Sequence, residues 1–231
     1  MNSARAAQAM QQLRAEESVI LPSLLLCDFG DLAGELVRLE DAGVKALHLD
    51  VMDGQFVPNL TYGMPIVEGL RKRTNLPLDV HLMIAEPSKY IPQFVEAGAD
   101  CITIHAEIEE DYRAVLSQIR DFGVGVGLAI NPDTALQTVE KDLSEIDLLL
   151  AMSVQAGFGG QAFNPAALEK LKSAQAQNPD LLLQVDGGIN LETIASCREA
   201  GASLFVVGSA IFRQPDYRVA IERLRKAMET A

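Results

Sequence analysis

Short runs rich in Val, Ile and Leu alternate with longer segments of mixed polarity from Val19 onward. This alternation is typical of βα units around a parallel sheet. Eight runs are predicted to form strands, at residues 19–24, 46–50, 78–82, 101–105, 124–130, 147–152, 181–185 and 204–207. Most of them are apolar almost throughout, which indicates strands that are covered on both faces.

The segments between these strands repeat apolar residues at helical spacing. Helices are predicted at residues 32–39, 64–71, 87–97, 112–122, 166–176, 191–200 and 217–228, with the shortest at 134–141. Asp133 and Asn190 precede helical runs as N-cap residues, and Pro87 and Pro165 suit first-turn positions.

Glycine recurs where three predicted helices lead into the next strand. Gly43, Gly98 and Gly201 each follow an alanine there, and glycine at that point takes the left-handed conformation that stops a helix. Polar side chains gather instead at the opposite ends of the strands: Ser23, His48, Asp50, His81, His105, Asn131, Ser153, Asp186 and Ser209.

Eight βα units with polar residues after the strands predict an α/β fold, the (β/α)8 TIM barrel, with its active site on that face. An open doubly wound sheet is the alternative, weakened because no GxGxxG follows the first strand. We expect residues 19–231 to form a single catalytic barrel domain. Residues 1–18 are an N-terminal extension, expected to be a short helix with Met10 and Leu13 facing the protein body or a neighbouring subunit.

Composition narrows the class of protein. The 231 residues, 48% of them hydrophobic, suffice for one domain with a large core. The net charge of -13 argues against nucleic acid or an anionic membrane as partner. No apolar run approaches the roughly 20 residues that span a bilayer. The leader lacks the apolar stretch of a secretory signal, and Cys27, Cys101 and Cys197 form no CxxC pair, so we expect a soluble protein of the reducing cytoplasm.

Two imidazoles and two carboxylates lie at the downstream ends of predicted strands. Side chains alternate along a strand, so His48 and Asp50 project to one side, and neighbouring strands can bring His81 and Asp186 to meet them. Singly, each residue could be a core histidine or a capping aspartate. Together they form a ligand set for one divalent metal, because no Lys or Arg lies in these motifs to compensate the carboxylates. Zn²⁺ suits the set best, with Fe²⁺, Mn²⁺ and Co²⁺ as alternatives.

Glycine-rich segments follow the last three predicted strands: Gly157-Phe158-Gly159-Gly160, Gly187-Gly188 and Gly208-Ser209. A single glycine after a strand is more often a turn. Three such segments in succession favour a phosphate site built from backbone N–H groups. Met52, Met83 and Met152 stand beside these motifs and are expected to line the site, although methionine is also common core filler. His105 is interpreted as a supporting or structural residue.

These motifs closely resemble the ribulose-phosphate 3-epimerase family from Ile20 to Ala227. The resemblance is carried by Leu21-Pro22-Ser23, the long segment from His48 to Asn59, His81-Leu82-Met83, His105-Ala106-Glu107, the segment from Gly157 to Gln161, Val185-Asp186-Gly187-Gly188 and the segment from Gly208 to Phe212. It implies a TIM barrel of the ribulose-phosphate binding type that interconverts D-ribulose 5-phosphate and D-xylulose 5-phosphate, in the pentose phosphate pathway or the Calvin cycle.

The resemblance also implies roles for individual residues. His48, Asp50, His81 and Asp186 would bind one metal ion per subunit, with Asp50 as proton acceptor and Asp186 as proton donor. The substrate contacts would be Ser23, His81, Gly157, Phe158, Gly159, Gly160, Asp186, Gly187, Gly188, Gly208 and Ser209. The reaction would remove the C3 proton from one face and return a proton to the other through an enediolate that the cation stabilises. A homo-oligomer acting on a small sugar phosphate is expected.

Two departures from the family pattern leave alternatives open. Gln155-Ala156 stands where an acidic or amide residue and proline normally precede Gly157, which predicts a looser phosphate loop, and Leu26-Cys27 replaces a small polar residue and alanine. A sister epimerase acting on a ketohexose phosphate such as D-allulose 6-phosphate would use the same metal and aspartates. A non-catalytic phosphosugar-binding barrel is the alternative from another class.

Overall fold

The computed structural model describes residues 2–229 and shows eight strands at the predicted places. They are β1 (Val19–Pro22), β2 (Leu47–Met52), β3 (Leu78–Met83), β4 (Cys101–His105), β5 (Gly125–Ile130), β6 (Leu148–Met152), β7 (Leu182–Asp186) and β8 (Leu204–Val207). Nearly every strand residue is buried on both faces, as their continuous apolar character predicts.

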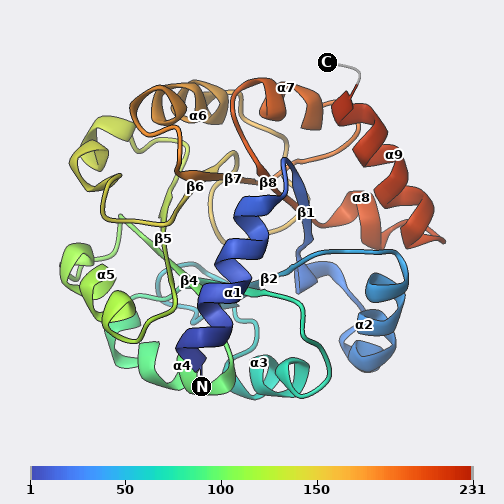
Figure 1. The fold of residues 1–231 in the computed structure, drawn as a ribbon, viewed down its shortest axis with the longest axis horizontal. Helices are drawn as coiled ribbons and strands as arrows, with labels where there is room; N and C mark the ends of the chain where they lie inside the picture. Colours follow the sequence, from blue (N-terminus) through green and yellow to red (C-terminus); the bar gives the residue numbers. More distant parts are fainter. Residues whose placement is uncertain (1, 230–231) are drawn as a thin grey trace.

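All eight strands run parallel in one sheet with the order β1-β8-β7-β6-β5-β4-β3-β2. A parallel bridge between Ser23 and His48 brings the end of β1 beside β2. The sheet is therefore a nearly closed barrel surrounded by helices, which confirms the predicted (β/α)8 fold (Figure 1).

The helices that cover the barrel are α2 (Leu32–Asp41), α3 (Met64–Arg71), α4 (Ile91–Ala97), α5 (Tyr112–Asp121), α6 (Ala166–Gln177), α7 (Ile194–Glu199), α8 (Ser209–Phe212) and α9 (Tyr217–Glu229). Their apolar faces pack on the outward side chains of the strands in one large core. The glycines predicted to end helices have positive φ angles: 75° at Gly43, 113° at Gly98 and 99° at Gly201.

The helix predicted at residues 134–141 is wrong. Two short 3-10 turns stand there, Leu136–Thr138 and Glu140–Asp142. The hydroxyl of Thr134 donates to Glu107, and that of Thr138 donates to the Ala135 carbonyl, so these side chains compete with helical hydrogen bonds.

Four residues predicted to start helices also need correction. Asp133 caps no helix, and its carboxylate accepts a hydrogen bond from Gln155 instead. Pro87 opens a 3-10 turn, Pro87–Lys89, ahead of α4, and Pro165 occupies the N-cap position of α6. Asn190 accepts from the Glu192 amide within a turn that precedes α7, so this helix begins three residues later than predicted.

The N-terminal extension is helix α1 (Asn2–Ala15), and it crosses one open end of the barrel (Figure 1). Met10 and Leu13 are buried with inward-facing strand residues, so they face the body of the protein. A β-carbon on Gly125, at the start of β5, would lie 2.5 Å from Met10 Sδ. A side chain at Gly125 would therefore displace Met10 from its place under the helix.

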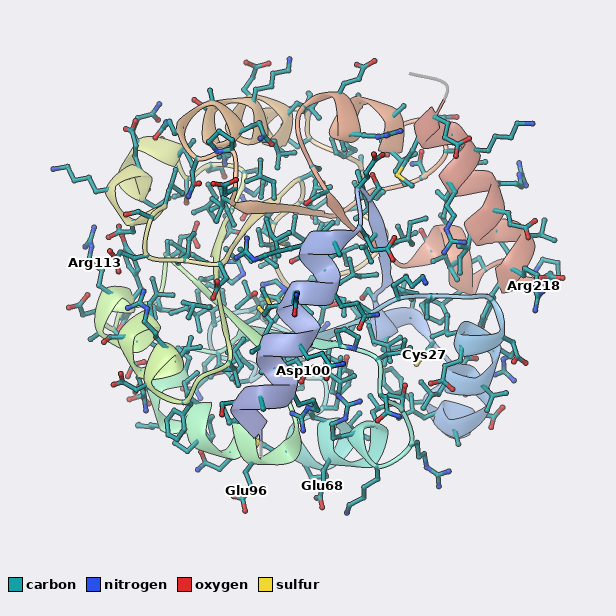
Figure 2. All side chains as sticks on the ribbon, in the orientation of Figure 1. Cys27, Glu68, Glu96, Asp100, Arg113 and Arg218 are labelled. Atoms are coloured by element: carbon teal, nitrogen blue, oxygen red, sulfur yellow. The ribbon has the colours of Figure 1, made fainter. Side chains whose placement is uncertain are left out.

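Two arginines fasten α1 to segments just before strands. Arg5 donates to Asp100, which precedes β4, and Arg14 donates to Asp147, which precedes β6. Asp100 lies by α1, whereas Arg113 and Arg218 point outward at the periphery (Figure 2). The helix thus closes the amino-terminal end of the barrel and leaves the carboxyl-terminal end for chemistry.

Within residues 2–229, no helix is both long and apolar enough to span a bilayer. Cys27, Cys101 and Cys197 are free thiols and all are buried. Burial raises the pKa of Cys27 and of Cys197 to about 12, so these thiols are poorly reactive.

Candidate active site

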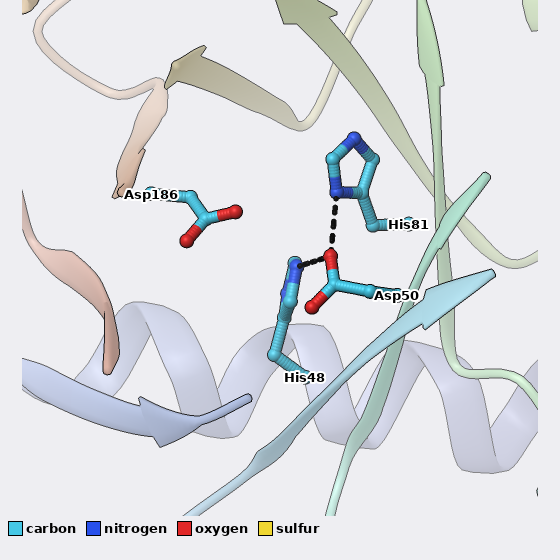
Figure 3. A group of neighbouring side chains, drawn as sticks. All are labelled: His48, Asp50, His81 and Asp186. Carbon is cyan, nitrogen blue, oxygen red and sulfur yellow. Dashed lines mark hydrogen bonds and ion pairs between the residues drawn. The ribbon is translucent and has the colours of Figure 1, made fainter. Parts of the chain in front are cut away.

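The predicted metal ligands come together from two adjacent strands, β2 and β3, and from β7 across the barrel. His48 and Asp50 alternate with outward residues along β2, and Asp50 pairs in register with His81 on β3. Asp186 ends β7 beside Met152. One ligand atom from each of these four side chains lies within 4.8 Å of all the others (Figure 3).

Asp50 stands at the centre of this group. Its Oδ2 accepts a hydrogen bond of 2.6 Å from Ser23 Oγ, and its Oδ1 lies 3.1 Å from His81 Nδ1. Burial alone would raise the pKa of the Asp50 carboxyl, but the imidazoles of His48 and His81 hold it well below its usual range. Asp50 is therefore ionised.

His48 is oriented from behind by a second carboxylate. Its Nδ1 lies 2.8 Å from Asp79 Oδ2, which also accepts from Gln184 Nε2 at 2.7 Å. Burial opposes a charge on His48, yet the carboxylates of Asp50 and Asp79 raise its pKa. His48 Nε2 lies 3.3 Å from Asp50 Oδ1 and forms no hydrogen bond, although it is fully buried.

Asp186 approaches from the opposite side of the site (Figure 3). Burial in the barrel mouth, followed by the negative charge of Asp50, raises the pKa of this carboxyl to about 7. Two aspartates in one pocket therefore differ in proton affinity.

His105, which the sequence left without a partner, lies behind His81. The Nε2 atoms of the two rings are 2.8 Å apart, and His105 Nδ1 is 3.0 Å from Glu107 Oε2. Burial, assisted by His81 and opposed by Glu107, lowers the pKa of His105 to about 4. His105 is therefore a neutral, buried ring in contact with a member of the four-residue group.

The four-residue group fits a divalent transition metal. It offers two imidazole nitrogens and two carboxylate oxygens, and one nitrogen, His48 Nε2, is buried without a hydrogen-bond partner. Asp79 accepts from the other nitrogen of that ring, which is the usual support of a metal-bound histidine. A cation here would compensate the carboxylates that no Lys or Arg in the group pairs with.

A cavity of about 220 Å³ opens above this group at the carboxyl ends of the strands. Its lining includes the predicted substrate and site-lining residues Ser23, Gly157, Phe158, Gly159, Gly160, Asp186, Gly187, Gly188, Gly208, Ser209, Met52, Met83 and Met152. His81 is not part of the lining, because its side chain is fully buried below the cavity. Its predicted contact with substrate stays a prediction.

The loop after β6 is held by several hydrogen bonds. Asn59, in the loop after β2, donates to the Gly157 carbonyl at 2.7 Å. The Ala156 amide donates to Asn131 Oδ1 at 3.2 Å, a bond that a proline at this position could not make. The unusual alanine thus supplies a tether of its own.

Sequence reasoning missed four contributors to the site. Arg213 is the only Lys or Arg in the lining of the cavity, and it is exposed at the end that holds Gly160 and Ser209. Asp79 and Gln184 lie inside the barrel, and alternation along β3 and β7 places them on the same face as His81 and Asp186. Glu107 contacts His105 of its own motif, and only the contact of His105 with His81 from another strand connects Glu107 to the site.

Comparison with known proteins finds one family over most of the chain. The model of the ribulose-phosphate 3 epimerase family matches residues 19–212. The ribulose-phosphate 3-epimerase of Bacillus subtilis is 45% identical over 211 residues, which cover 89% of this chain and 97% of that protein. That of Synechocystis is 42% identical over 215 residues, covering 90% of this chain and 94% of that protein.

A more distant likeness concerns the fold alone. A solved mutant tryptophan synthase α-subunit from Pyrococcus furiosus aligns with a TM-score of 0.67 at 17% identity, over 93% of this chain and 97% of that one. The family model and the relatives cover the barrel and its site, and the chain therefore belongs to the ribulose-phosphate 3-epimerase family.

Proposed function

We propose that this chain inverts C3 of D-ribulose 5-phosphate to give D-xylulose 5-phosphate, and the reverse, with one divalent metal ion per subunit. The observation that carries the proposal is the convergence of Asp50 and Asp186 from opposite sides of one pocket. Inversion beside a ketone needs a proton acceptor on one face of the sugar and a proton donor on the other.

The surroundings of the two aspartates support distinct roles. Asp50 accepts from Ser23 and is ionised, so it suits removal of the C3 proton. Asp186, with its pKa raised to about 7, can hold a proton near neutral pH and deliver it to the other face. In the reverse reaction the roles exchange.

The metal would be held by His48, Asp50, His81 and Asp186. When bound, a divalent cation supplies positive charge that stabilises the substrate oxygens as the C3 proton leaves. Zn²⁺ is the first expectation, because two imidazoles and two carboxylates suit it. Met52, Met83 and Met152 line the same pocket, where their apolar side chains would limit the access of water to a bound sugar.

The phosphate is proposed to lie at the end of the cavity formed by Gly160, Gly188 and Ser209. Glycines leave backbone N–H groups accessible there. The guanidinium of Arg213 adds a positive charge: its Nη2 lies 3.9 Å from the place that a β-carbon on Gly160 would occupy. A protein of net charge -13 thereby presents one cation to an anionic substrate.

The test is turnover of D-ribulose 5-phosphate in D₂O by metal-replete protein. We expect D-xylulose 5-phosphate carrying deuterium at C3, because the donated proton exchanges with solvent. If the protein bound the sugar without deuterium uptake, it would be a non-catalytic phosphosugar-binding barrel and the proposed activity would be wrong. D-allulose 6-phosphate, run in parallel, should turn over at least tenfold less efficiently, and the opposite ranking would identify a hexose-phosphate epimerase.

A further inference from the structure

A chain of two buried imidazoles and one partly exposed carboxylate runs outward from the proposed metal site. His81 Nδ1 faces Asp50, His81 Nε2 faces His105 Nε2 at 2.8 Å, and His105 Nδ1 faces Glu107 Oε2 at 3.0 Å. Both rings are fully buried, so solvent takes no part in these contacts. The direction of each hydrogen bond is therefore set within the chain.

The carboxylate of Glu107 determines that direction. An ionised carboxylate only accepts, so His105 Nδ1 must carry the proton and donate. A neutral imidazole has one N–H, which leaves a lone pair on His105 Nε2. The 2.8 Å contact between the two Nε2 atoms then requires His81 Nε2 to donate. A metal-binding imidazole is neutral, so as a ligand His81 has its lone pair on Nδ1.

We propose that Glu107 and His105 are positioning residues that fix the tautomer of His81, so that its Nδ1 lone pair points at the metal site. The proposal deepens the proposed function and rests on the metal site described there. The proposal gives the His105-Ala106-Glu107 motif a physical role. The carboxylate of Glu107 only accepts, and this fixes which nitrogen donates first in His105 and then in His81. Without the hydrogen bonds from Glu107 through His105, the proton of His81 could reside on Nδ1, where it would face the site and block metal coordination.

The assignment requires a cation between His81 and Asp50. His81 Nδ1 and Asp50 Oδ1 lie 3.1 Å apart. With the lone pair of Nδ1 turned toward a carboxylate oxygen, two acceptors face each other, an arrangement that a shared cation stabilises. His48 is prepared in the same sense by Asp79, which accepts from its Nδ1 and leaves Nε2 free.

The decisive variant is Glu107→Gln. The second carboxylate oxygen of Glu107, Oε1, accepts from the Asn131 amide at 2.7 Å and from the Thr134 hydroxyl, and the carbonyl of glutamine can keep these contacts. The glutamine amide would then donate to His105 Nδ1. This reverses both ring contacts and places a proton on His81 Nδ1, with little change in shape.

The measurement is the Zn²⁺ dissociation constant, determined by competition with a chelating indicator. We expect Glu107→Gln to weaken Zn²⁺ binding by about 10- to 100-fold, the usual loss when the support of a metal-bound histidine is removed. Glu109→Gln is the matched control, because it removes the same charge from an exposed side chain of the same loop. Thr134→Val removes the structural contact to Glu107 while leaving the carboxylate, and both controls should bind Zn²⁺ within twofold of the parent.

A spectroscopic readout separates the relay from a merely structural role. The chain contains only three histidines, so labelling with ¹⁵N-histidine gives six ring nitrogen signals. In the zinc-loaded parent we expect a protonated Nδ1 and a bare Nε2 on His105. A proton on His105 Nε2, or equal Zn²⁺ affinity of Glu107→Gln and parent, would overturn the relay. A parent that takes up no Zn²⁺ would overturn the proposed metal site with it, so the two failures are distinct.

Discussion

Asp50 and Asp186 are identical side chains that the barrel places in different surroundings. Ser23 and two imidazoles favour the charged form of Asp50, whereas confinement near Asp50 favours the protonated form of Asp186. The spacing of each motif placed both residues after strands, but their unequal proton affinities depend on contacts between strands.

Replacing either aspartate should therefore abolish one proton transfer. We expect Asp50→Asn and Asp186→Asn each to lower kcat/KM by about 10²- to 10⁴-fold, the usual contribution of a general acid or base. The rate must be measured together with zinc content, because both side chains are proposed ligands. A fully zinc-loaded variant with activity within a few-fold of the parent would contradict the assigned role.

Replacing Arg213 tests whether its charge contributes to binding of the sugar phosphate. Arg213→Ala should raise KM for the sugar phosphate by about two- to fivefold with kcat nearly unchanged, since an exposed cation contributes modestly to anion binding. The effect should shrink at high ionic strength. Arg213→Lys keeps the charge, and Arg223→Ala removes an exposed arginine from α9; an equal effect of Arg223→Ala would show that only the overall charge matters.

Among the elements, α1 has the most distinct structural role. Its Leu13 is 1% exposed and packs among the inward residues of the barrel, while Arg5 and Arg14 fasten the helix at the ends of strands remote from the site. The helix thus covers apolar side chains that an open barrel end would expose to water.

Leu13→Ala should lower the free energy of unfolding by about 2–5 kcal/mol, since it leaves a cavity under α1. In a chain of this size that corresponds to a Tm lower by roughly 5–15 °C. Gln12→Ala, on the exposed face of the same helix, should change stability by less than about 0.5 kcal/mol. Below its Tm the Leu13→Ala protein should keep the KM of the parent, and a raised KM would couple α1 to the pocket.

For the whole molecule, metal binding and folding are linked. Four ligands from β2, β3 and β7 meet only in the folded barrel, so a bound ion stabilises the native state alone. Zn²⁺ at 100 times its dissociation constant should add about 2.7 kcal/mol of stability, or roughly 5–10 °C in Tm.

Differential scanning calorimetry with and without chelator measures this shift. Asp186→Asn should reduce the shift, because it removes one proposed carboxylate ligand. Gln12→Ala should retain it in full. A Tm that does not depend on Zn²⁺ in the parent would contradict a site of useful affinity.

The eight βα units, and the strand ends at which polar side chains collect, could be predicted from the sequence. The alternation of short apolar runs with helical periodicity is a local property, and parallel strands carry their polar ends to one face. His48, Asp50, His81 and Asp186 were identifiable for that reason. Residues 134–141 were misjudged, because the hydrogen bond from Thr134 to Glu107 joins segments distant in the chain.

The groups that support the predicted ligands became visible only in the folded barrel. Asp79 supports His48, Glu107 acts on His81 through His105, and Arg213 enters the cavity from the far end of the chain. The contacts of Asp79 with His48 and of His81 with His105 join different strands, and distances across the barrel leave no periodic signal in the sequence. The direction of a hydrogen bond depends on such partners, so the choice of ring nitrogen that faces the site could not be predicted from composition or spacing.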